Sequence, residues 1–178
     1  KAKNPVTLRP ETMGKSAMLG SLEDTLEMSK AIKNVQPCLD FAHLHARPGY
    51  VVLLTNYSGS TGFGEAFSRG IQGDPLQGPA DEINQAADEA IRRYPFIDGS
   101  KQVAGGASYG GHLSNWLAVT TDRYRAIASH AGLYDLKTQW TTSDVVYNRE
   151  RTLGGPAWDS DLAVWRKQSP FYRSTKLG

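Results

Sequence analysis

The apolar and polar positions of this chain change their spacing several times, as they do in domains that mix strands and helices. Residues 50–55 form a short β-branched and apolar run, typical of a strand buried on both faces of a parallel sheet. Residues 81–93 place Ile and Ala on one side of an amphipathic helix, and residues 112–120 predict a second, apolar helix. Residues 101–104 and 124–130 predict further strands. This order predicts an α/β domain with a mainly parallel sheet flanked by helices.

The first quarter of the chain does not share this alternation. Ser21 begins a segment that is rich in Leu, Glu, Met, Lys and Ala, and the spacing predicts a helix as far as about Val35. Pro37 ends that segment. We therefore divide the chain into an unassigned segment, residues 1–46, which is helical in part, and an α/β domain, residues 47–178.

Composition narrows the classes of partner. The chain has 178 residues and a formal net charge of only +2, which gives no reason to expect nucleic acid as a partner. No apolar run approaches the ~20 residues that span a bilayer, so we expect a soluble protein that does not bind membranes, either cytoplasmic or secreted or periplasmic. The single Cys38 excludes an internal disulfide. We expect no cofactor. We also expect no metal, because four Asp residues lack metal-ligand spacing: Asp74, Asp135, Asp144 and Asp159.

The candidate chemistry lies in the sequence GGASYGG, residues 105–111. It contains the pattern G-x-S-x-G, in which a sharp turn from a strand into a helix exposes a serine hydroxyl at the end of a sheet. We therefore predict that Ser108 is a nucleophile and that the backbone N–H of Tyr109 donates to the oxyanion. The alternative is a structural serine in a glycine-rich turn. A nucleotide-binding turn is disfavoured, because neither G-x-x-x-x-G-K-[ST] nor G-x-G-x-x-G is present.

A serine nucleophile needs a base, and none of the four histidines is well placed in the sequence. In this fold the residues follow the chain order Ser, Asp or Glu, His, and His43 and His45 precede Ser108. His112 lies on the helix that follows the turn, where a packing or capping role is expected. His130 ends the next strand and is expected to line the site. The residues alone leave the triad incomplete.

Several motifs in order resemble the catalytic domain of the prolyl oligopeptidase family of serine peptidases. They are GYVVLLTNYSGSTGFGEAF, VAGGASYGGHLSNWLAV, YRAIASHAGLYDL, LGGPAWD and WRKQSPF. The resemblance covers residues 47–178, and its nearest branch contains the dipeptidyl peptidase and acylaminoacyl peptidase-like enzymes. It implies an α/β-hydrolase fold, here incomplete, with Ser108 as nucleophile, Tyr109 as an oxyanion donor, and a β-propeller domain that admits only short peptides.

The resemblance also implies features that this sequence lacks. The His-Gly-Gly-Pro-like stretch of the family is absent before residue 50, and the catalytic Asp and His would lie beyond Gly178. Aromatic residues after His130 line the primary specificity pocket in the family, which makes Trp140 and Tyr147 the candidates here, although each would serve equally well as a core or surface residue.

These observations predict a serine exopeptidase that cleaves short peptides through an acyl-enzyme on Ser108. The substrate is then a peptide, and the chain associates with the missing parts of the enzyme or forms an oligomer. Two alternatives stay open: a carboxylesterase or lipase on the same fold, and a non-catalytic hydrolase fragment that acts as an interaction module.

Overall fold

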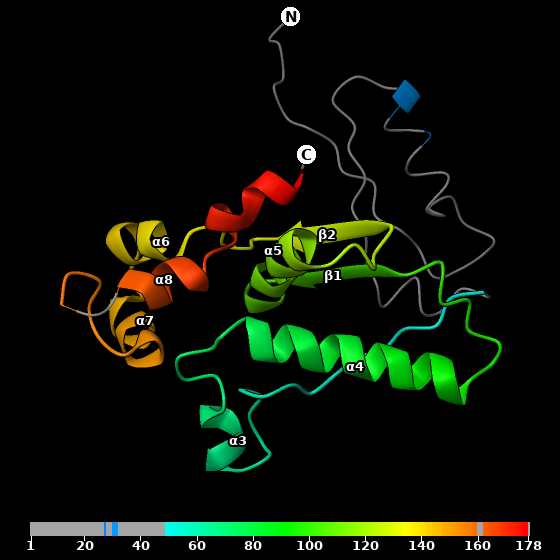
Figure 1. Ribbon diagram of the computed structural model, residues 1–178, viewed down its shortest axis with the longest axis horizontal. Helices are drawn as coiled ribbons and strands as arrows, with labels where there is room; N and C mark the ends of the chain where they lie inside the picture. The colour runs from blue at the N-terminus through cyan, green and yellow to red at the C-terminus, as the bar shows by residue number, and fades with distance from the viewer. Residues whose placement is uncertain (1–26, 28–29, 32–48, 160–161, 178) are drawn as a thin grey trace, which may run out of the picture. The chain divides into compact units, whose positions relative to one another are not determined.

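The computed structural model describes residues 27, 30–31, 49–159 and 162–177 (Figure 1). The chain divides into two compact units, Lys1–Leu54 and Thr55–Gly178. The helix expected over residues 21–35 lies almost entirely outside the described residues, and the boundary between residues 46 and 47 stays a prediction. All of the elements below belong to the second unit.

Two parallel strands form the sheet of this unit. Strand β1, Val103–Ala107, pairs with β2, Ala126–His130, so that Ala107 lies opposite His130. Helix α5, Tyr109–Thr120, connects them and packs on both (Figure 1). The predicted alternation is therefore confirmed here, but β1 continues through Gly105 and Gly106, beyond the predicted end at residue 104. Ladder hydrogen bonds involve only the backbone, so β2 holds these glycines in the strand.

The strand predicted at residues 50–55 is wrong. These residues form no strand and have no ladder partner among the residues that the structure describes. Val51 and Leu54 are 57% and 87% exposed, respectively. An apolar run indicates a tendency to be buried, but a strand forms only where a neighbouring strand pairs with its backbone.

Helix α4, Gln77–Arg93, begins four residues before the predicted start. The carboxylate of Asp74 accepts hydrogen bonds from the backbone N–H groups of Gln77 and Gly78, both at 3.1 Å. Pro79 is compatible with the first turn, where backbone N–H groups have no intrahelical partner. The helix therefore includes residues 77–80, which precede the predicted range of 81–93.

Five short helical elements were not predicted. They contain five to eight residues each, too few for a clear apolar period, and they depend on tertiary contacts. They are α3 (Glu65–Arg69), α6 (Leu136–Thr142), α7 (Val146–Leu153), α8 (Leu162–Lys167) and the 3₁₀-helix η1 (Pro170–Leu177). Of the helices that the structure describes, none combines the length and the apolarity needed to cross a membrane.

The apolar side chains gather in two clusters. In the first, α4 and α5 pack together over the sheet; its buried members are Leu76, Ala80, Leu113, Trp116 and Leu117. The second joins α6, α7 and α8, which stand together in Figure 1; its buried members are Leu136, Trp140, Leu153, Ala157 and Trp165. The first cluster supports the sheet and α5, and the second holds the short helices.

Gln168 connects the end of the described chain to the start of α4. Its side chain is fully buried; its Oε1 accepts from the Leu76 N–H at 3.0 Å and its Nε2 donates to Asp74 Oδ1 at 2.8 Å. Both bonds join residues that are more than 90 positions apart in the sequence. This one amide therefore holds the cap of α4 against the residues that follow α8.

We predict that Gln168→Ala lowers the free energy of unfolding by about 2–3 kcal/mol, because it leaves the buried Leu76 N–H without an acceptor and removes one of the two hydrogen bonds to Asp74 Oδ1. Urea denaturation measures the change. The control is Gln77→Ala, which removes an exposed bond to Asp81 and should cost less than about 0.5 kcal/mol. Equal losses in the two variants would contradict this role of Gln168.

Candidate active site

Ser108 is the single residue between β1 and α5. Its backbone has φ 54° and ψ −115°, a sparsely populated conformation for a residue with a side chain, and the residue is exposed. Its N–H donates to the carbonyl of His130 at 2.9 Å, and its carbonyl accepts from the N–H of His112 at 3.0 Å. The sheet on one side and the helix on the other hold Ser108 in this strained turn, as the sequence pattern predicts.

Glycines allow the turn to close. A methyl carbon on Gly106 would lie 2.6 Å from the carbonyl carbon and oxygen of Gly110. A methyl carbon on Gly111 would lie 2.4 Å from the carbonyl oxygen of His130, and one on Gly132 would lie 2.5 Å from the Gly111 carbonyl. The start of α5 therefore approaches both β1 and the turn after β2 at distances that only glycine permits.

The first turn of α5 contributes hydrogen-bond donors beside Ser108. The N–H of Tyr109 belongs to this turn, where backbone amides lack an intrahelical carbonyl, and the helix dipole favours negative charge there. The side chain of Tyr109 is held elsewhere: its hydroxyl donates to the Pro75 carbonyl, and its ring lies 5.9 Å from that of Tyr57. Burial raises the pKa of Tyr109, so the phenol is neutral. Its role as an oxyanion donor stays a prediction that concerns the backbone alone.

His112 is packed beneath the turn. It is 1% exposed, its ring contacts Tyr109 edge to face at 6.5 Å, and its Nε2 has no hydrogen-bond partner among the described residues. Burial, together with the charge of Arg149, lowers the pKa of His112 to about 3. An imidazole with this pKa is a weak base at neutral pH, which agrees with the packing role expected from the sequence.

The other histidines do not complete a triad within the described residues. His130 is exposed at the end of β2, beside the serine turn, where it would line the site. No hydrogen bond joins the Ser108 hydroxyl to a histidine in the part of the chain that the structure describes. His43 and His45 lie outside that part.

The two aromatic candidates for the specificity pocket lie in different surroundings. Trp140 is 9% exposed within the second cluster; its ring contacts Trp165 at 5.8 Å, and its Nε1 donates to Glu150 at 3.1 Å. Tyr147, on α7, is 73% exposed. These positions fit a core residue and a surface residue, and a role in binding substrate stays a prediction for both.

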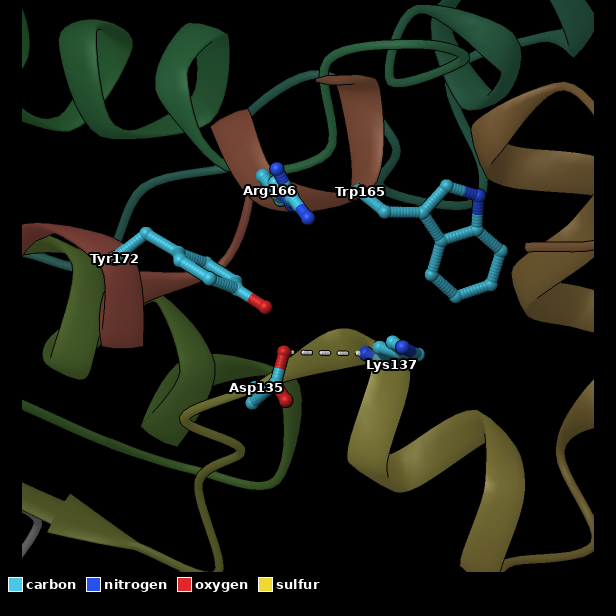
Figure 2. A pocket seen from close by; sticks show the side chains of 5 residues that line it. All are labelled: Asp135, Lys137, Trp165, Arg166 and Tyr172. Atoms are coloured by element: carbon cyan, nitrogen blue, oxygen red, sulfur yellow. Dashed lines mark hydrogen bonds between the residues drawn. The ribbon is translucent and has the colours of Figure 1, made fainter. Parts of the chain in front are cut away.

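A small pocket has none of the residues of the serine turn in its lining (Figure 2). Its lining residues are Asp135, Lys137, Trp165, Arg166 and Tyr172. The dashed line in Figure 2 joins the Asp135 carboxylate to the Lys137 backbone N–H, the bond that caps α6. The only carboxylate among the lining residues of the pocket therefore caps the start of α6. Among the described residues, no three His, Cys, Asp or Glu side chains are grouped to hold a metal ion.

The sequence does not mark one charged residue whose charge acts on side chains of α5. Arg149, on α7, is partly buried, and burial lowers its pKa. Its charge acts on both Tyr109 and His112. No sequence signal marked it, because α7 itself was not predicted and a charged residue is expected to face solvent.

Comparison with known proteins places these features in a family. The profile described as "Prolyl oligopeptidase family" matches residues 40–177. The chain is 36% identical over 122 residues to dipeptidyl-peptidase 5 of Porphyromonas gingivalis, which covers 68% of this chain and 18% of that protein. It is 32% identical over 129 residues to dipeptidyl-peptidase 5 of Aspergillus fumigatus, and this alignment covers 70% of this chain and 18% of that protein. The chain thus spans less than a fifth of the length of these relatives.

Solved structures with the same fold agree. Pyrococcus horikoshii acylaminoacyl peptidase superposes with a TM-score of 0.71 at 23% identity, over 78% of this chain and 23% of that one. A second structure of that peptidase, uncomplexed, gives a TM-score of 0.64 at 22% identity, over 98% and 26%. The expected α/β-hydrolase fold, a parallel sheet flanked by helices, is confirmed for the part of the fold that this chain contains.

The close approach at Gly106 generates a stability prediction. Gly106→Ala should lower the free energy of unfolding by roughly 2–3 kcal/mol, because the new methyl group overlaps the backbone of Gly110. The matched control is Gly110→Ala. Apart from its chain neighbours and the backbone of its own helix, the new methyl group would meet no atom within 4 Å, so stability should change by less than about 1 kcal/mol. Thermal and urea unfolding measure both, and a harmless Gly106→Ala would show that the turn is looser than described.

His112 generates a prediction about pH. Its folded pKa, about 3, is below the unfolded value of about 6.5, so the unfolded state binds the proton first and stability falls as the pH drops below about 6.5. Between pH 7 and pH 5 this loss is about 2 kcal/mol. Urea denaturation at pH 7 and at pH 5 measures this loss of unfolding free energy. In His112→Phe the loss between the two pH values should be smaller by about 2 kcal/mol. Identical pH profiles for the two proteins would mean that His112 takes up its proton at the same pH in the folded and the unfolded state.

Proposed function

Because the chain belongs to the prolyl oligopeptidase family, we propose that it is part of a serine peptidase in which Ser108 is the nucleophile. The observation that carries the proposal is the backbone conformation of Ser108, which is held at φ 54° between a strand and a helix. Ser108 is an exposed residue at the carboxyl end of the sheet. Such strain persists only where the surrounding structure enforces it, and it is concentrated at functional sites.

The proposed reaction uses this geometry. Ser108 Oγ forms a bond to the carbonyl carbon of the substrate while its proton passes to a base, and the carbonyl oxygen becomes an oxyanion that accepts from the Tyr109 N–H. The C–N bond then breaks, the amine leaves with the proton, and the acyl group stays on Ser108. Water, deprotonated by the same base, releases the acyl group as a carboxylic acid and regenerates the hydroxyl.

The identity of the catalytic base is a separate part of the proposal. His112 is buried with a low pKa, so we infer that a His and an Asp from sequence beyond Gly178 complete the triad. The short coverage of the relatives supports this, since the aligned segment is 18% of dipeptidyl-peptidase 5 of Porphyromonas gingivalis. We further propose exopeptidase activity, release of dipeptides or blocked amino acids from peptide N-termini, on the names of these relatives and of the superposed acylaminoacyl peptidases.

The test is labelling by a fluorophosphonate, which reacts with activated serines, in the protein as its source makes it. We expect a single adduct on Ser108 by peptide mapping, and Ser108→Ala should reduce labelling to background because no other hydroxyl occupies the turn. Ser100→Ala, at an exposed serine bonded to Asp98, should label as the unsubstituted protein does.

Three outcomes of this test argue against parts of the proposal. An intact protein that gives no adduct would contradict nucleophilic catalysis and support a non-catalytic role. An adduct on another serine would contradict the role of Ser108. If Ser108 is labelled but the protein hydrolyses nitrophenyl esters and not aminoacyl anilides, an esterase is supported instead of a peptidase.

A further inference from the structure

Two helices hold the turn at residues 57–60. The carboxylate of Glu82, on α4, accepts with one oxygen from the backbone N–H of Ser58 at 2.7 Å and with the other from the Ser58 hydroxyl at 2.5 Å. The N–H of Gly59 donates to the carbonyl of Phe67, on α3, at 2.9 Å. Hydrogen bonds to a charged acceptor are stronger than those between neutral groups, so Glu82 fixes this turn against α4.

The turn carries Tyr57, whose ring contacts the residue that follows the candidate nucleophile. The ring centroids of Tyr57 and Tyr109 lie 5.9 Å apart, with 39° between the ring planes, which is within the range of favourable aromatic pairs. Both rings also pack against the first apolar cluster. Burial raises the pKa of the Tyr57 phenol, so the contact with Tyr109 is made by a neutral ring.

The side chain of Tyr109 is thus held at two points, the carbonyl of Pro75 at its hydroxyl and Tyr57 at its ring. Its backbone N–H lies in the first turn of α5, where amides have no intrahelical acceptor to fix them. An oxyanion donor has to point at the place where negative charge develops, and a displacement of about 1 Å can lower a rate 10²-fold. The contacts of this side chain therefore bear on the amide beside Ser108.

We propose that Tyr57 is a positioning residue for the oxyanion amide: its ring holds the side chain of Tyr109, and Glu82 holds the turn that carries Tyr57. In this role neither residue touches the substrate, so their loss slows the chemical step and leaves substrate binding unchanged. The inference rests on the proposed peptidase function and names the residues that position its oxyanion donor.

The first experiment compares Tyr57→Leu, which removes the ring, with Tyr57→Phe, which keeps it. For hydrolysis of a dipeptidyl anilide, we expect Tyr57→Leu to lower kcat at least about tenfold and to change KM less than about twofold. Tyr57→Phe should keep kcat within about twofold, because the ring makes the contact. Rates are expressed per active site counted by fluorophosphonate labelling, so that a smaller folded fraction does not lower kcat.

A control for the loss of an aromatic pair is Tyr94→Leu. Tyr94 is 49% exposed at the end of α4, and its ring contacts Phe96 at 5.8 Å. This substitution should leave both kcat and KM unchanged.

The second experiment tests the hold on the turn. Glu82→Gln keeps the shape of the side chain but replaces one acceptor oxygen by an NH₂ group, which cannot accept from Ser58. We expect kcat to fall about three- to tenfold with KM unchanged. The matched control is Asp81→Asn, at the preceding residue of α4, whose carboxylate accepts an exposed bond from Gln77. It should leave kcat and KM as they are.

The outcomes separate this inference from the proposed function. If Ser108 is labelled but Tyr57→Leu keeps its kcat, or raises KM alone, the inference is overturned and the peptidase stands. Equal losses in Tyr57→Leu and Tyr57→Phe would also overturn it, because the hydroxyl and not the ring would then act. If Tyr57→Leu fails to fold, Glu82→Gln decides, and an unchanged kcat overturns the inference. If neither the protein nor any variant is labelled, the proposed function itself fails.

Discussion

The candidate active site depends on the close approach of three backbone segments: the end of β1, the start of α5 and the turn after β2. Gly106 faces Gly110, and Gly111 faces Gly132, at separations in which a methyl group would overlap the opposite backbone. Ser108 lies between these contacts and has no conformational alternative that keeps both the strand ladder to His130 and the helix. The exposed hydroxyl is thus a consequence of how the sheet meets the helix.

The charges around the turn follow from the packing that supports it. His112 is neutral because the first apolar cluster and Tyr109 surround it, and the positive charge of Arg149 lowers its pKa further. The side chain of Tyr109 is fixed to the loop before α4, which leaves its backbone N–H at the start of α5 beside Ser108. Burial therefore leaves a neutral imidazole beneath the turn and the Tyr109 amide beside Ser108.

Part of this structure could be predicted from the sequence. The pattern of short apolar runs and helical spacing found β2, most of α4 and the parallel connection through α5, because these elements have strong periods. The G-x-S-x-G pattern found the turn, because the glycine at Gly106 reports a steric requirement of the backbone itself.

The rest depends on contacts that the local sequence does not encode. Residues 50–55 have the composition of a strand but no partner among the described residues. The helices after β2 are stabilised by distant bonds, such as those of Gln168 to Leu76 and Asp74. In the sequence, a tryptophan such as Trp140 looks the same whether it lies in a core or in a pocket. The burial of Arg149 depends on how α7 packs. The candidate nucleophile could therefore be predicted, and its surroundings could not.

The central claim is that the turn presents Ser108 as a nucleophile beside the Tyr109 amide. The most direct measurement is a crystal structure of the protein, as its source makes it, after reaction with a fluorophosphonate. Our account predicts a bond from Ser108 Oγ to phosphorus and a phosphoryl oxygen about 2.7–3.1 Å from the Tyr109 nitrogen. A phosphoryl oxygen directed away from that amide, or an unmodified Ser108, would contradict it.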